Sequence, residues 1–219
     1  SAKPAAAPLA AAYAQIAQRD FANSWISAAL LSGPPEIVAG VLYPALTRDP
    51  AQARTMAAFV AKLIEIRAAS KPTEGFASLI DFVAQPATSP LWLRALGDGL
   101  RRAGTSIEQA DTGKKLASVF SRAGTTVADP KAAPAARLEA VELLSVSSLA
   151  QSREALTSTL SPGQPEALQV AAIKVLSQHA VTEVTAILIR SWAQVAPKAK
   201  EAALTSLMGR EDRQTALLD

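Results

Sequence analysis

A helical phrase that recurs three times in the C-terminal half of the chain constrains the fold more than any other feature. The copies read AARLEAVELLSV, ALQVAAIKVLSQ and KAKEAALTSLMG. When they are aligned, an alanine and a leucine coincide in every copy, at steps of 32 and 31 residues: Ala140, Ala172 and Ala203, and Leu144, Leu176 and Leu207. Self-similarity at a period of about 20–50 residues is typical of repeat proteins. The phrase therefore predicts an array of helical repeats.

Each copy forms the first helix of a predicted helical hairpin. Apolar residues such as Leu168, Ala172 and Leu176 recur at the spacing of one helical face, and not with the alternation of a strand. A second helical phrase follows each copy: SLAQSREALTSTL, AVTEVTAILIRSW and REDRQTALLD. One hairpin cannot bury both of its faces, so neighbouring hairpins must stack. We predict an all-α fold, an α-solenoid of stacked helical hairpins, without strands.

The clearest helix start in the N-terminal half is the sequence DPAQ. Asp49 can cap the free N–H groups of the first turn, and Pro50 suits the first helical position. One helix is predicted from Pro50 to Ala69. Its predicted apolar face consists of Met56, Phe59, Val60, Leu63 and Ile64.

The whole chain, 1–219, is predicted to be a single array. Its first part, 1–124, is less regular, and the repeats over 134–219 are more regular. The stretch TTVADPKAA, residues 125–133, is predicted to be a loop between them. The start and the end of the sequence indicate a piece excised from a longer protein.

Composition narrows the classes of function. The chain has no cysteine, which excludes disulfides, thiolate metal sites and cysteine nucleophiles. Its formal net charge of +3 over 219 residues permits an acidic partner without requiring one. No apolar run approaches the ~20 residues of a membrane span, so we predict no membrane insertion. No cofactor is predicted.

Three segments resemble a known family. LWLRALGDGLRRAG (91–104), DFANSWISAALLSG (20–33) and RLEAVELLS (137–145) are similar to a HEAT-like region of large planctomycete-type bacterial proteins. In those proteins the region follows a β-propeller domain of the membrane-bound-dehydrogenase type and precedes a cytochrome-c-like domain with a CxxCH motif. The resemblance implies a HEAT-like solenoid that spaces or docks domains of a redox-type protein exported to the periplasm or beyond. Without cysteine, neither the haem nor the propeller's activity carries over to this chain.

The candidate binding residues are a group of cations and one tryptophan. The cations lie close together in sequence: Arg94, Arg101, Arg102, Lys114 and Lys115, with Arg122 beyond them. Some HEAT-like solenoids, including a group that resembles DNA glycosylases, bind DNA on a basic concave face. The alternative interpretation is a solvated face with i,i+4 pairs such as Arg94 with Asp98. The three tryptophans, Trp25, Trp92 and Trp192, stand beside aliphatic residues, so core packing is the default interpretation for each. If any of them is exposed and binds a partner, Trp92 is the preferred candidate, because it stands near these cations.

Catalytic and phosphate-binding candidates are weaker. His179 is the only histidine, and the sequence offers it no nucleophile or second metal ligand. Gly97 and Gly99 lack the preceding strand and the GK[ST] of a phosphate loop, so close helix packing or a local bend explains them better, with Gly104 as a C-terminal cap.

Carboxylates occur in three local pairs: Glu108 with Asp111, Glu139 with Glu142, and Glu211 with Asp212. Neighbours on one helix surface do not face each other across a substrate cleft. We therefore expect a noncatalytic module that binds protein domains of its parent chain or of another protein, or spaces them apart. The alternative is a nucleic-acid-binding HEAT-like protein of the DNA-glycosylase-like kind, and nucleic acid is the less expected partner.

Overall fold

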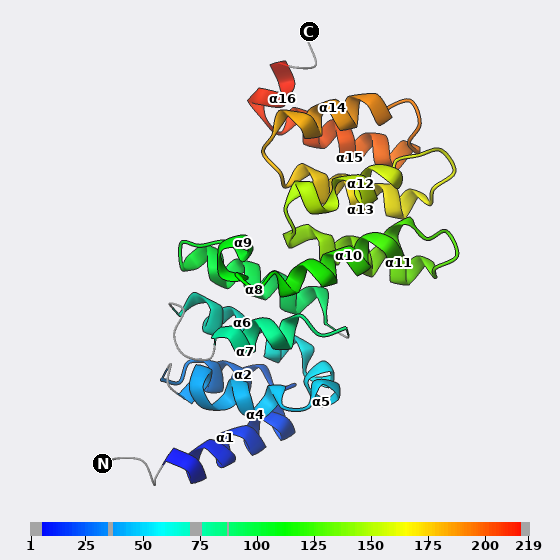
Figure 1. The fold of residues 1–219 in the computed structure, drawn as a ribbon. Helices are drawn as coiled ribbons and strands as arrows, with labels where there is room; N and C mark the ends of the chain where they lie inside the picture. The colour runs from blue at the N-terminus through cyan, green and yellow to red at the C-terminus, as the bar shows by residue number, and fades with distance from the viewer. Residues whose placement is uncertain (1–5, 35–36, 71–75, 87, 216–219) are drawn as a thin grey trace. The chain divides into compact units, whose positions relative to one another are not determined.

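The computed structural model describes residues 6–34, 37–70, 76–86 and 88–215. Within these residues every regular element is a helix, which confirms the predicted all-α class (Figure 1). The chain divides into two compact units, Ser1–Leu116 and Ala117–Asp219.

Helices of the first unit run in the order α1 (Ala6–Asp20), α2 (Ser24–Leu31), a π-helical turn (Val38–Leu42), α4 (Tyr43–Thr47), α5 (Pro50–Thr55), α6 (Ala57–Ala69), α7 (Phe76–Val83), α8 (Pro90–Arg102) and α9 (Ile107–Ala110). The core of this unit lies where α6 and α8 pack along each other. Leu63 and Ile64 of α6, with Leu93, Leu96 and Leu100 of α8, are fully buried.

The single helix predicted over 50–69 is wrong in one respect, because it breaks at Met56. The Asp49 carboxylate caps the start as predicted and accepts the N–H groups of Ala51 (2.9 Å) and Gln52 (3.4 Å). Met56 leaves the helical region (φ −109°, ψ 26°), and its N–H bonds to the carbonyl of Ala53 in a tight turn. The predicted apolar face is nonetheless buried throughout.

Gly99 allows α8 to approach α6 closely, as the sequence predicted. A β-carbon at this position would lie 2.4 Å from the backbone oxygen of Glu65 and 2.6 Å from the β-carbon of Ala68. Gly104, with φ +76°, follows the end of α8, where its N–H bonds to the carbonyl of Arg101 and the next N–H, of Thr105, bonds to that of Leu100. This arrangement is a Schellman motif and confirms the predicted cap.

We expect Gly99→Ala to destabilise the protein by about 1–3 kcal/mol, the usual cost of overpacking, because a backbone oxygen cannot move aside alone. Gly124→Ala is the matched control, since Gly124 also lies inside a helix and its new methyl would meet only Ala155 at 3.6 Å. That substitution should stabilise by about 0.5–1 kcal/mol through helix propensity. Urea unfolding measures both. An equal effect of the two substitutions would contradict the close packing.

The second unit contains α10 (Lys115–Ala128), which begins at the boundary between the units, α11 (Pro134–Leu143), α12 (Leu149–Ser158), α13 (Glu166–Ser177), α14 (Thr182–Ser191), α15 (Pro197–Met208) and α16 (Glu211–Thr215). Figure 1 shows α11, α13 and α15 in succession within this unit, and α13 contacts both of the others. The second helices α12 and α14 also contact α13.

The positions that the three phrases align are buried in all three helical segments. The aligned alanines and leucines are at most 3% exposed: Ala140, Ala172, Ala203, Leu144, Leu176 and Leu207. The predicted loop at 125–133 is shorter than expected, because α10 continues to Ala128. Buried Val127 extends its apolar face, and the hydroxyls of Thr125 and Thr126 bond back to carbonyls one turn earlier.

Candidate interaction surface

The predicted cations of the first unit are exposed, but three of them pair with carboxylates. Arg101 donates to Asp98 (2.6 Å) within α8. Arg102 donates across to Glu65 of α6 (2.8 Å), and Lys115 pairs with Asp81 of α7. The expected pair of Arg94 with Asp98 is therefore replaced by the pair with Arg101.

These pairs direct the cations toward different helices. Glu65, which is 8% exposed, also accepts Lys62 of its own helix at 2.9 Å, and its pair with Arg102 joins α6 to α8. Lys114 has φ 51° and stands exposed before α10, and Arg94 stands exposed on α8. Arg122 belongs to the second unit. Exposed ion pairs contribute about 0–1 kcal/mol each, so the cluster stabilises the fold only modestly.

Trp92 packs in the core, as the default interpretation predicts, so its choice as the preferred exposed tryptophan is wrong. Trp92 is 2% exposed, its indole N–H donates to the carbonyl of Ala57 (3.1 Å), and its ring lies 4.9 Å from that of Phe82. The exposed tryptophan is instead Trp25 on α2, at 85% exposure, while Trp192 is 37% exposed. Trp92 is a core residue that anchors α8 on α6 and α7.

The remaining candidates have structural contacts. Asp111 is 8% exposed, and its carboxylate accepts the N–H groups of Lys115 (2.9 Å) and Leu116 (2.7 Å) at the start of α10. Glu139 and Glu142 are exposed on α11. Asp212 pairs with Arg210 at 3.0 Å, and this hydrogen bond lowers the pKa of the Asp212 carboxyl. Among the described residues, no group of three or more acidic or histidine side chains is placed to hold a metal ion.

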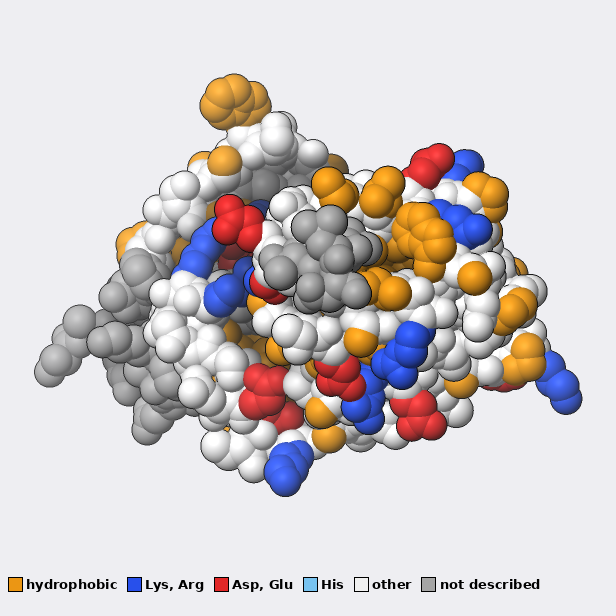
Figure 2. Space-filling model, turned by 90° about the horizontal axis from the view of Figure 1, so that it is seen from above, with side chains coloured by type: hydrophobic (Ala, Val, Ile, Leu, Met, Phe, Trp, Pro, Cys, Tyr) orange, Lys and Arg blue, Asp and Glu red, His pale blue; other side chains and the backbone are white. Residues whose placement is uncertain are grey.

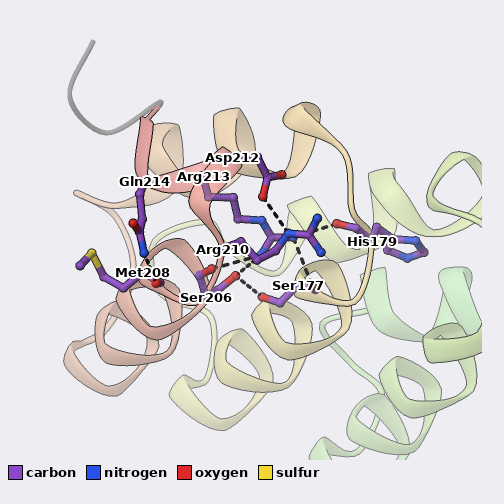
Figure 3. A network of polar contacts seen from close by, with 8 residues as sticks. All are labelled: Ser177, His179, Ser206, Met208, Arg210, Asp212, Arg213 and Gln214. Atoms are coloured by element: carbon purple, nitrogen blue, oxygen red, sulfur yellow. Dashed lines mark hydrogen bonds and ion pairs between the residues drawn. The ribbon is translucent and has the colours of Figure 1, made fainter.

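Arg213 of α16 is a buried cation at the centre of a polar network (Figure 3). Its guanidinium donates to the carbonyls of Ser177 (3.1 Å) and His179 (2.8 Å), and to the carbonyl and hydroxyl of Ser206. Burial of the guanidinium lowers the pKa of Arg213, and repulsion from the nearby positive charge of Arg210 lowers it further. Because α13 ends at Ser177, the guanidinium sits at the negative end of that helix dipole. His179, in the turn between α13 and α14, thus serves this network through its backbone.

Two hollows in the second unit were not predicted from the sequence. The larger, of about 770 Å³, lies between α12 and α14, with the Arg153–Glu183 ion pair (2.6 Å) in its wall and Leu160 and Ile187 among its apolar lining. The smaller, of about 300 Å³, is lined by Ile189 and Trp192 at the end of α14 and by Leu204 and Leu207 of α15. Figure 2 looks onto the end of the second unit where α14, α15 and α16 lie in Figure 1, and it shows hydrophobic side chains at the surface there.

The repeat alignment alone does not reveal the smaller hollow. Leu204 occupies the position of Val141 and Ile173, which are 0% and 1% exposed, yet Leu204 itself is 48% exposed. The same repeat position is therefore buried in the first two copies and exposed in the third. Periodicity alone could not predict this difference, because all three residues continue one apolar pattern.

Within the described residues, no helix combines the length and the apolar character that a membrane crossing requires. No family model, curated protein or solved structure matches this chain.

Proposed function

We propose that the chain is a HEAT-like α-solenoid that acts as a noncatalytic protein-interaction or spacer module. The observation that carries the proposal is the repeated packing of the second unit. First helices α11, α13 and α15 follow one another with the same alanine and leucine positions buried. Such regular stacking provides a rigid spacer and a long surface, which are the uses of repeat proteins.

Polar side chains at one repeated position support this packing. Three residues before each aligned alanine stand Arg137, Gln169 and Lys200. Arg137 donates to the carbonyl of Val127 (2.8–2.9 Å) and to Gln164 (2.9 Å), which precedes α13. Gln169 donates to the carbonyl of Ser161 (3.2 Å) and accepts the N–H of Ala196 (2.8 Å), which precedes α15. Arg137 and Gln169 thus tie their own repeats to the next.

The resemblance to planctomycete-type proteins supports a place for this module inside a larger, exported redox-type protein. A sequence encoding CxxCH downstream of residue 219 in the gene would support that assignment, and a gene without a propeller or haem domain would overturn it.

The alternative function, nucleic-acid binding, has the exposed cations in its favour. The ion pairs of Arg101, Arg102 and Lys115 weigh against it, because a cation held by a carboxylate releases fewer counterions on binding a phosphate. The proposed module instead binds or separates protein domains.

We expect the protein to bind duplex DNA no more tightly than the ~10⁻⁴–10⁻⁶ M of nonspecific contact at physiological salt. Fluorescence anisotropy with a labelled duplex measures this at several salt concentrations. The double substitution Arg101→Ala/Arg102→Ala should change the affinity no more than Arg190→Ala/Arg210→Ala, which removes the same charge from the second unit. Submicromolar binding that only the first pair abolishes would replace the proposed function with the alternative.

A further inference from the structure

One face of α13 receives the following repeat, and its hydrogen bonds identify that face. Glu166 accepts the N–H of Lys198 (3.3 Å), Gln169 accepts that of Ala196, and the Ser177 hydroxyl bonds to that of Ser206 (2.6 Å). These three residues and Ile173 follow one another at spacings of three and four, which places them on a single helix face. We call Glu166, Gln169, Ile173 and Ser177 the outer stripe of α13.

The same face of α15 carries an outer stripe at the equivalent positions. One repeat step from the residues of α13 leads to Pro197, Lys200, Leu204 and Met208. Leu204 and Met208 are 48% and 55% exposed, whereas Ile173 is 1% exposed beneath the following repeat. Trp192 is similarly open at 37%, although Leu160, one repeat step earlier and just after α12, is 1% exposed. The outer stripe of α15 and the 300 Å³ hollow beside it form one open apolar surface.

We propose that this surface binds an amphipathic α-helix of a partner protein, which lies on α15 as α15 lies on α13. The proposal rests on the proposed interaction function and names its surface and its kind of partner. The proposal is supported by the repeated docking of one helix on the next: α13 docks on α11, and α15 docks on α13, in one register. The outer stripe of α15 has an apolar residue at its centre, Leu204, as the outer stripe of α13 has Ile173. An amphipathic helix in a groove is a common recognition mode, with anchors at i, i+3, i+4 and i+7.

The chemistry of the partner helix follows from Lys200. At this position Arg137 donates to Gln164 ahead of the next helix, and Gln169 accepts a backbone N–H there. The Lys200 ammonium can only donate, so its partner must supply an acceptor. We infer a helix with an acidic or amide side chain just before or within its first turn. An aliphatic or aromatic side chain of the same helix fills the hollow among Ile189, Trp192 and Leu204.

A segment of this chain provides the probe. Residues 164–179 dock onto α11 in the structure and begin with the acceptor Gln164. An isolated peptide of this length is marginally helical, so a lactam between Lys174 and a Gln178→Glu substitution, both on exposed positions, holds it helical. Binding is read from Trp192 fluorescence in a Trp25→Phe background, because the other remaining tryptophan, Trp92, is buried.

We expect saturable binding with a blue shift of Trp192. Leu204→Glu should weaken the affinity at least tenfold, while Leu91→Glu, which changes a leucine of nearly equal exposure (47% against 48%) on α8, should leave it unchanged. Circular dichroism of both variants verifies that each is folded.

Two results would overturn the proposal: absence of saturable binding, or binding that Leu204→Glu and Leu91→Glu affect equally. A third would be a dimer of the protein in sedimentation velocity that Leu204→Glu dissociates, because the surface would then belong to a second copy of the chain. None of these results would alter weak DNA binding, so they separate the failure of this surface from the failure of the proposed function.

Discussion

Replacing Leu176 by alanine is expected to lower the free energy of unfolding by about 2–5 kcal/mol, as core leucines do. Leu176 is fully buried on α13, the helix that contacts α11 on one side and α15 on the other. The substitution removes apolar contacts and leaves a cavity where two repeats meet, and close-packed neighbours fill such a cavity only in part. Urea unfolding followed by circular dichroism measures the loss.

Leu204→Ala is the matched control for this prediction, because Leu204 is a leucine of the neighbouring first helix α15 that is 48% exposed. It should change stability by less than about 0.5 kcal/mol, the usual range for surface substitutions.

In a repeat array the loss at Leu176 should be confined mainly to adjacent repeats. Hydrogen exchange should therefore accelerate in α11 to α15 and change little in α6 and α8. Uniform acceleration in all helices, or unchanged stability, would contradict the repeat position of Leu176.

The repeat register was predictable because helix geometry fixes it. A first helix must present its alanine and leucine columns to its neighbours, so the columns recur wherever the same packing recurs. The break at Met56 was not predictable from this pattern. It lies inside an unbroken apolar stripe, without a glycine or proline, at a point where Ala53 and Met56 are both buried in the folded unit.

The candidate site was harder to predict because sequence spacing does not determine which carboxylate each cation takes as its partner. Arg94 was expected to pair with Asp98 one turn away, yet Asp98 pairs with Arg101, and Arg102 reaches Glu65 on another helix. The tryptophans show the same limit. Trp25 and Trp92 both stand among aliphatic residues, and only the packing of α8 on α6 and α7 distinguishes the buried one.

Arg213 shows that a charged residue in a polar phrase can be a core residue. The sequence REDRQ suggests a solvated helix start, and Arg210 and Asp212 do form an exposed pair there. Arg213 instead turns inward to the end of α13, where free carbonyl groups need donors. A planar guanidinium with five N–H groups can serve several carbonyls at once, which a lysine ammonium cannot do in the same geometry.

We therefore expect Arg213→Met to destabilise the second unit by at least about 2 kcal/mol, because it leaves buried carbonyls without donors at about 1–3 kcal/mol each. Arg213→Lys should recover only part of this loss, although it keeps the charge. Arg210→Met, which removes an exposed cation three residues earlier, is the control and should stay within about 0.5 kcal/mol of the wild type. Urea unfolding gives the three values, and hydrogen exchange should show the end of α13 opening in Arg213→Met alone. A methionine variant as stable as the wild type would mean that apolar packing compensates for the lost hydrogen bonds, and the network at Arg213 would then not hold α16 to α13.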